Sequence, residues 1–195
     1  MAGAACLTGG NSATIQNALN TTGVAELCQG ATFQADVPIY VPNGGKIFTT
    51  GFPTNDTLKA LITVPAGVTY PNPVIQAYTA ANAEIRNIKI DGNRAANGAV
   101  YARALIAISG NNSILDRVRA TNTSGLAAIA ASDNPNCSGL QLTNNYIGEN
   151  GLHTGAGENP FANGIDFRCN NAYVAYNEIR DATDGAISST GAATQ

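Results

Sequence analysis

A chain of 195 residues is long enough to form one domain with a buried core, because a chain of about 150 residues already buries roughly 70% of its unfolded surface. Charged residues make up only 12% of the sequence and the net charge is −3, which excludes a disordered charged tail and a basic nucleic-acid-binding domain. No apolar run approaches the roughly 20 residues that span a bilayer, so we expect no insertion into a membrane.

The first element in chain order is a short amphipathic helix, predicted over residues 11–23. Asn11 is a suitable capping residue at its start, and Gly23 ends it. One face of this helix carries the apolar residues Ile15, Ala18 and Leu19. It is the one helix that the sequence predicts clearly.

The sequence changes to short β-rich runs from residue 24 onward. Examples are Val37-Pro-Ile-Tyr-Val41 and Leu61-Ile-Thr-Val64, and turns that contain Gly and Pro separate such runs. Many short strands without intervening helices exclude a doubly wound α/β fold.

A degenerate repeat runs through the β-rich part. Four segments align on their last residues: Ile85-Arg-Asn-Ile88, Leu115-Asp-Arg-Val118, Asn144-Asn-Tyr-Ile147 and Tyr176-Asn-Glu-Ile179. A second apolar row follows them at Ile106, Ile129, Ile165 and Ile187. The longest step in that row contains the glycine-rich stretch 148–162, which we predict to protrude as a loop from one coil.

The two rows indicate a solenoid in which each repeat forms one coil. Inward Ile and Val side chains would stack on their equivalents one coil away, while Asn or Gly takes the left-handed backbone conformations of the corners. Such residues recur as Asn144-Asn145, Asn163-Gly164, Asn170-Asn171 and Asp184-Gly185. The alternative is an antiparallel sandwich, which does not require two apolar rows that advance in step. We therefore predict one domain over residues 1–195, with coils over residues 24–190.

Several segments resemble a known superfamily. They are Asn87-Ile-Lys-Ile-Asp-Gly-Asn93, Leu142-Thr-Asn-Asn-Tyr-Ile147 and Asn163-Gly-Ile-Asp-Phe-Arg-Cys-Asn-Asn171, the last followed by the run 174–187. They look like the right-handed parallel β-helix repeats of the pectin-lyase-like superfamily, which includes pectate lyases and polygalacturonases. The resemblance covers about residues 11–190 and implies an all-β fold, a right-handed parallel β-helix with a short N-terminal capping helix. It also implies a polysaccharide ligand, although the superfamily contains lyases, hydrolases, epimerases, tailspikes and adhesins.

The active-site motifs known in this superfamily are missing. The hydrolase pattern of Asn-Thr-Asp, Asp-Asp, Gly-His-Gly and Arg-Ile-Lys does not occur, and the Trp-containing pectate-lyase motif cannot exist in a chain without tryptophan. Two classes of function therefore stay open. The first is a polysaccharide-binding β-helix that acts as a polysaccharide lyase or a glycoside hydrolase. The second is a non-catalytic structural or adhesive β-helix that self-associates.

The best candidate catalytic cluster combines a strand with the loop before it. If Ile165 points inward, strand alternation turns Asp166 and Arg168 outward on one face. His153 and Glu158 lie in the predicted loop immediately before this strand. Because two carboxylates can divide the work of glycosidic cleavage between an acid and a base or nucleophile, these four residues are the catalytic candidates.

Other residues are predicted to bind the polysaccharide or a cation. The substrate-binding candidates are Asp181, Asp184, Tyr146 and Tyr173. Alternatively, Asp166 and Asp184 could hold calcium together with backbone carbonyls, which would leave Arg168 to face an acidic sugar. A weaker candidate is the turn-like Asp91-Gly-Asn93 with Arg94. Each acidic residue also has a structural interpretation as a turn cap or as half of a surface ion pair.

The four cysteines form two pairs that are local in the sequence, Cys6 with Cys28 and Cys137 with Cys169. There is no Cys-X-X-Cys spacing and only one histidine, so we expect no zinc site. Local pairing is the simplest of the three possible connectivities, and it predicts two disulfides and a secreted, extracellular protein. The first residues lack the charged start and long apolar stretch of a signal peptide, so we expect the chain to begin after a removed signal.

The last coil has no amphipathic segment after it that is comparable to the helix over 11–23. An uncovered end of a β-helix exposes backbone groups that can pair with another chain. We therefore expect a homo-oligomer in which two chains meet through residues 179–187 about a twofold axis. The alternative is a longer protein whose further coils cover this end.

Overall fold

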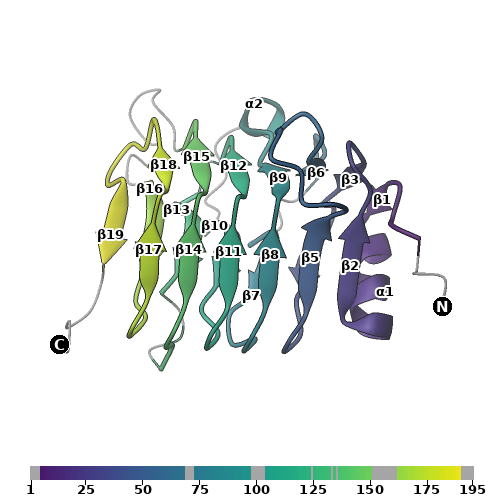
Figure 1. The fold of residues 1–195 in the computed structure, drawn as a ribbon. Coiled ribbons are helices and arrows are strands. Elements are labelled where there is room, and N and C mark those ends of the chain that lie inside the picture. Colours follow the sequence, from purple (N-terminus) through teal and green to yellow (C-terminus); the bar gives the residue numbers. More distant parts are fainter. Residues whose placement is uncertain are drawn as a thin grey trace.

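The chain winds through three parallel β-sheets in a fixed order, one strand per sheet in each coil (Figure 1). The computed structural model describes residues 5–68, 73–97, 104–123, 125–132, 134, 136–150 and 162–189. Every strand pair in this described part is parallel, and each strand pairs with strands of the neighbouring coils. This is the arrangement of a parallel β-solenoid, so the predicted all-β fold of stacked coils is confirmed.

Each sheet collects one side of the coils. Sheet A contains β2 (Val24–Leu27), β5 (Lys46–Thr49), β8 (Glu84–Arg86), β11 (Ile114–Asp116), β14 (Gln141–Thr143) and β17 (Tyr173–Ala175). Sheet B contains β1 (Gly10–Asn11), β3 (Thr32–Gln34), β6 (Ala60–Thr63), β9 (Ile88–Asp91), β12 (Arg119–Thr121), β15 (Tyr146–Gly148) and β18 (Glu178–Ile179). Sheet C contains β4 (Ile39–Tyr40), β7 (Ile75–Ala77), β10 (Ala104–Ile108), β13 (Ala127–Ala131), β16 (Asn163–Phe167) and β19 (Ile187–Ser189).

Rows of apolar side chains in register form the core between the sheets. In sheet C the row is Ile39, Ile75, Ile106, Ile129, Ile165 and Ile187. This confirms the second apolar row predicted from the sequence, and it adds two members upstream. All of its members except Ile187 are fully buried. A single coil cannot bury these side chains alone. Their stacking on the equivalent side chains of neighbouring coils therefore supplies most of the stabilisation of the solenoid.

The alignment of the other predicted row is wrong by two residues at Ile147 and at Ile179, which is in register with it. Lys89 and Arg119 are in register, so Val118 does follow Ile88 as predicted. In the next coil, however, Ile147 is in register with Ala120. The position equivalent to Val118 is therefore taken by Asn145, which is buried.

Sheet C departs from simple strand alternation. The consecutive residues Leu105 and Ile106 both belong to the main core, as do Ala128 and Ile129 in the next strand. A second buried cluster forms from Ala104, Ala107 and Ala130, with Tyr78 packed against it. Both faces of β10 and β13 are consequently buried.

The corners between sheets are formed by residues with left-handed backbone conformations. The corner after sheet C uses Gly44, Asn82, Asn112, Gly139 and Asn171; the corner after sheet A uses Asn87, Arg117, Asn144 and Tyr176; the corner after sheet B uses Asn93, Asn122, Glu149 and Asp181. The predicted corner roles of Asn144 and Asn171 agree with this pattern, whereas Asp184-Gly185 lies in the connection between β18 and β19 without a left-handed conformation. Asn163-Gly164 does not agree with it either, because both residues lie within β16.

The predicted helix is present as α1 (Ser12–Thr22), at the end of the molecule where the coils begin (Figure 1). Asn11 accepts a hydrogen bond from the Thr14 N–H as the N-cap, and Gly23 ends the helix with a φ of 75°. Ile15 and Leu19 are buried in the core cluster. A second helix, α2, is only four residues long (Arg94–Asn97). Neither described helix is long and apolar enough to cross a membrane.

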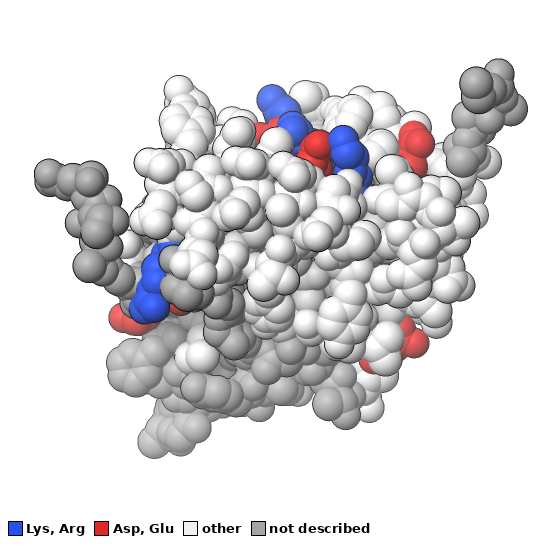
Figure 2. All heavy atoms as spheres, turned by 90° about the horizontal axis from the view of Figure 1, so that it is seen from below, with Lys and Arg blue, Asp and Glu red and all other residues white. Residues whose placement is uncertain are grey.

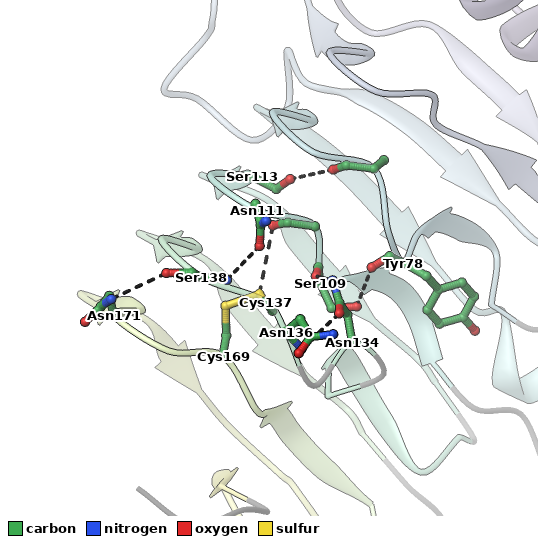
Figure 3. Close-up of a disulfide and its surroundings, with 12 residues drawn as sticks. Tyr78, Ser109, Asn111, Ser113, Asn134, Asn136, Cys137, Ser138, Cys169 and Asn171 are labelled. Carbon is green, nitrogen blue, oxygen red and sulfur yellow. Dashed lines mark hydrogen bonds between the residues drawn. A yellow bond between two sulfur atoms is a disulfide. The ribbon is translucent and has the colours of Figure 1, made fainter. Parts of the chain in front are cut away.

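Both predicted disulfides are present. Cys6 pairs with Cys28, and Cys137 pairs with Cys169. The second bond joins consecutive coils at the corner between sheets C and A (Figure 3). Two disulfides are compatible with a secreted protein. Of the predicted loop over 148–162, Gly148 belongs to β15 and Asn150 pairs with Ala182, while residues 151–161 lie outside the described part.

Candidate functional site

The outer face of sheet C carries a polar and aromatic row across its coils. Each position follows one of the isoleucines of the core row, in the order Tyr40, Gln76, Ala107, Ala130, Asp166 and Ser188, and the polar and aromatic members are all of these except the two buried alanines. Neighbouring strands lie about 4.8 Å apart, so four steps place Asp166 about 19 Å from Tyr40 along the sheet.

A hollow of about 360 Å³ lies at the Tyr40 end of this face. Tyr40 and Tyr78 line it together with the amide side chains of Asn43 and Gln76. The Oδ1 atom of Asn43 accepts a hydrogen bond from the Ala81 N–H at 2.9 Å. This contact holds the Asn43 side chain in place.

Each of the two amides still has a hydrogen-bonding atom to offer. Gln76 donates from Nε2 to the Pro73 carbonyl at 3.3 Å, and Asn43 uses only its Oδ1 atom. Within the described residues, Oε1 of Gln76 and Nδ2 of Asn43 have no hydrogen-bond partner. The hollow is therefore lined by one amide with a remaining acceptor, one amide with a remaining donor and two aromatic side chains.

The residues between the two ends of this face are buried, so its exposed polar members lie at the ends. Tyr78 packs against the buried alanine cluster of Ala104, Ala107 and Ala130. Its backbone carbonyl accepts a hydrogen bond from the Ser109 hydroxyl at 2.7 Å, and the Ser109 carbonyl in turn accepts one from Nδ2 of Asn134 at 3.0 Å (Figure 3). These two hydrogen bonds thus tie the segment that contains Tyr78 to the next two coils.

Asp166 lies at the other end of the face, half-buried on β16. Its Oδ2 atom accepts a hydrogen bond from the Ser132 hydroxyl at 2.8 Å. Arg168 is the residue that follows β16, and it is exposed. Its backbone N–H donates a hydrogen bond to the Ala131 carbonyl at 3.1 Å. The structure thus places Asp166 and Arg168 close to the end of the same strand. His153 and Glu158 lie outside the described residues.

The four predicted substrate-binding residues do not come together. Tyr146 lies on β15 of sheet B, whereas Tyr173 lies on β17 of sheet A. A hydrogen bond with Tyr176 raises the pKa of the Tyr173 hydroxyl. Asp181 is a corner residue with a φ of 62°, and Asp184 lies in the connection between β18 and β19. The tyrosines of sheets A and B are therefore separate from the row on sheet C.

The predicted cation sites gain no support from the geometry. No group of three or more His, Cys, Asp or Glu side chains that could hold a metal ion is found in the part of the chain that the structure describes. In the weaker candidate, Oδ1 of Asp91 accepts hydrogen bonds from the Asn93 N–H at 2.7 Å and from Nδ2 of Asn122 at 3.0 Å. These are the contacts of a turn, which the Asp-Gly-Asn sequence also indicates.

Charged residues on sheet A form a compensated network that the sequence did not reveal. Lys46 pairs with Glu84 at 2.8 Å, and Arg86 contacts both Glu84 at 3.1 Å and Asp116 at 3.8 Å. The Asp116 carboxylate is almost fully buried and also pairs with Arg117 at 2.8 Å. The face seen from below is otherwise mostly uncharged, with acidic and basic side chains alternating in one band (Figure 2). Because each charge has a partner, we attribute this network to stability.

Sequence reasoning missed the hollow at Tyr40. Extending the isoleucine row upstream to Ile39 and Ile75 would have found it, because Tyr40 and Gln76 follow these residues as Asp166 follows Ile165. The step from Ile39 to Ile75 is 36 residues, which equals the longest step farther along the row. No family model, no curated protein and no solved structure matches this chain.

Proposed function

We propose that this chain is a carbohydrate-binding β-helix that holds a polysaccharide at the two exposed ends of the outer face of sheet C, the Tyr40 hollow and Asp166. The observation that carries the proposal is the hollow itself, which Tyr40 and Tyr78 line together with two amides that each keep a polar atom without a partner among the described residues. Sugar rings present apolar faces to aromatic rings and hydroxyl groups to amides, so this combination suits them.

The same face offers a group for bond cleavage. Asp166 supplies a carboxylate that the Ser132 hydroxyl orients, and Arg168 supplies a positive charge near the end of the strand. A carboxylate in this position can act as the acid or base of glycoside hydrolysis, or as the base of a lyase. The activity we propose is thus polysaccharide cleavage with Asp166 as the acid–base residue.

Binding and cleavage are tested separately. Binding is measured by calorimetry against pectic, alginate, xylan and fructan oligosaccharides. We expect Tyr40→Ala to weaken binding of the preferred sugar about tenfold, which corresponds to about 1.4 kcal/mol. The matched control is Tyr173→Ala, an exposed tyrosine on sheet A, which should leave binding unchanged.

Cleavage is measured on the same panel by new reducing ends and by the absorbance of unsaturated products. Asp166→Asn should abolish product formation and leave binding within about twofold, because it keeps the size of the side chain. If no sugar binds, or if Tyr40→Ala and Tyr173→Ala behave alike, the proposed site is wrong. If sugar binds and no product forms from any substrate, the chain binds without catalysis.

The proposal includes membership of the pectin-lyase-like superfamily, secretion, and a capping role for α1. The three-sheet coil path, the paired disulfides and the burial of Ile15 and Leu19 support it. Truncation of residues 1–22 tests the capping role. It should expose the edge of the first coil and make the protein aggregate, which light scattering would detect.

A second candidate function is self-association without catalysis. Within the described residues, β17, β18 and β19 each pair with a strand on one side only. Ile187 is 48% exposed, while its equivalents Ile129 and Ile165 are fully buried. We therefore propose that two copies meet through residues 179–187. Light scattering at high micromolar concentration should show a dimer that Ile187→Lys disrupts, and a strict monomer would contradict this candidate.

A further inference from the structure

Two positive charges lie in register on the outer face of sheet B. Lys89 on β9 pairs directly with Arg119 on β12. Like charges on adjacent strands repel each other and destabilise a sheet. Sheet A of the same molecule avoids this: Lys46 is in register with Glu84, and Arg86 is in register with Asp116. The exception on sheet B therefore requires an explanation other than stability.

Neither cation has a close ion pair among the described residues. Within the part of the chain that the structure describes, Lys89 forms no ion pair and no side-chain hydrogen bond. Asp91, two residues along the same strand, accepts hydrogen bonds from Asn93 and Asn122 instead. Arg119 has only a long ion pair with Asp56, at 3.6 Å, and Asp56 is held more closely by Lys59 at 2.6 Å.

Arg119 is nevertheless held in a defined position. Its guanidinium carbon lies 3.8 Å from the centre of the Tyr146 ring, which belongs to the next strand of the sheet. Stacking of this kind fixes the plane of the guanidinium and leaves its N–H groups pointing sideways. No described residue accepts a hydrogen bond from these N–H groups, although the side chain is only 36% exposed. A guanidinium that is oriented but has no acceptor is prepared for a ligand.

A third cation lies near the same ring and comes from the next coil. The guanidinium carbon of Arg180 is 6.0 Å from the centre of Tyr146, and Arg180 pairs with Glu178. Tyr146 thus lies between two arginines contributed by the coils before and after it. The ring offers an apolar surface directly beside the donors of Arg119.

We propose that the outer face of sheet B binds an oxyanion, a carboxylate or a sulfate, with Lys89 and Arg119 as its ligands. Arg119 donates two parallel hydrogen bonds to the anion, Lys89 contributes its charge, and Tyr146 stacks against the group that carries it. The sources of such an anion are an acidic sugar unit or a free inorganic anion. This site lies on a different sheet from the proposed polysaccharide face and does not depend on it.

The test measures binding of three probes at low ionic strength by calorimetry: a uronic-acid trisaccharide, a neutral trisaccharide of the same length, and sodium sulfate. We expect the uronic-acid trisaccharide to bind, the neutral one not to bind at this site, and added salt to weaken binding. Lys89→Gln and Arg119→Gln should each weaken binding at least tenfold. Lys46→Gln, which removes a compensated charge from sheet A, is the matched control and should change affinity less than twofold.

Protein stability supplies a second readout that a purely structural role would not give. Without anion, Lys89→Gln should be as stable as the unaltered chain or more stable, because the substitution removes a repulsion. Sulfate that binds as tightly as the trisaccharide, with the same dependence on Lys89, would identify the ligand as a free anion. The proposal is wrong if neither anion binds, if Lys46→Gln weakens binding as much as Lys89→Gln, or if Lys89→Gln lowers stability. Tyr40→Ala and Asp166→Asn should leave anion binding unchanged, so failure of one site does not imply failure of the other.

Discussion

Asn145 and Asn177 form a ladder of amides at the corner between sheets A and B, where each fills the same position in consecutive coils. Nδ2 of Asn145 donates to Oδ1 of Asn177 at 2.9 Å and to the Leu115 carbonyl at 3.1 Å. Its Oδ1 atom accepts from the Val118 N–H at 3.0 Å. The side chain thereby satisfies backbone groups of the preceding coil that are buried away from water.

Replacement of Asn145 by Ala should lower the free energy of unfolding by about 3 kcal/mol, since each buried polar group left without a partner costs about 1–3 kcal/mol. Asn177→Ala is the matched comparison, because Asn177 lies at the last rung and is only half-buried. It should cost clearly less. Urea denaturation of both variants checks this, and equal losses would show that the ladder is not what stabilises this corner.

Asn145 also explains which part of the fold could be predicted from the sequence. The row of Ile106, Ile129, Ile165 and Ile187 was recoverable because an apolar residue occupies that position in every one of these coils. In the other row amides replace the apolar residue of two consecutive coils, so an alignment on apolar repeats falls two residues onward, at Ile147 and Ile179. Hydrogen bonding makes the amides acceptable there, and that bonding is invisible in a hydrophobicity pattern.

The candidate site could be predicted only in part, for a similar physical reason. Asp166 was predictable because it adjoins a recognisable inward isoleucine. Tyr146 and Tyr173 were grouped with it by residue type, but the three residues lie on three different sheets. A one-dimensional repeat does not state which side of a triangular coil a residue occupies unless the corners are located. The corners were obscured by residues such as Glu149 and Tyr176, which adopt left-handed conformations without being Asn or Gly.

Glu149 provides a second prediction. Its φ of 53° places it in the left-handed region, where Asn122 occupies the equivalent corner of the preceding coil. A left-handed conformation costs most residues roughly 1–2 kcal/mol and costs Asn less. Glu149→Asn should therefore raise the free energy of unfolding by up to about 1 kcal/mol, measured by thermal or chemical denaturation. The same substitution at Glu26, a strand residue of β2, should give no gain, and a gain of equal size there would attribute the effect to lost charge.

Glu84 predicts how stability depends on pH. The hydrogen bond from Lys46, together with the charges of Lys46 and Arg86, lowers the pKa of the Glu84 carboxyl below its ordinary value of 4.5, against the opposing effect of burial. A carboxyl whose pKa is lower in the folded state stabilises the protein above its unfolded pKa, and this stabilisation is lost as the pH falls. The melting temperature should thus drop below pH 4.5, and the drop should be smaller in Glu84→Gln. Glu26→Gln, which removes a carboxylate without an ion pair to a described residue, should retain the full drop.

The disulfide between Cys137 and Cys169 provides the last prediction. It closes a loop with a sequence separation of 32 residues, which includes the whole of the predicted protruding loop. In the chain-entropy description, a cross-link over a loop of this size stabilises the folded state by roughly 3–4 kcal/mol, because it restricts the unfolded chain.

Cys137 is fully buried and packs in the core, so a double Cys→Ala change would also create a cavity. Reduction of the unaltered protein keeps both sulfur atoms and therefore separates the loss of the cross-link from the loss of packing in that variant. Mass spectrometry after alkylation should find no free thiol before reduction. A melting transition that stays in place after both bonds are reduced would show that the stacked coils, and not the cross-links, supply the stability of this region.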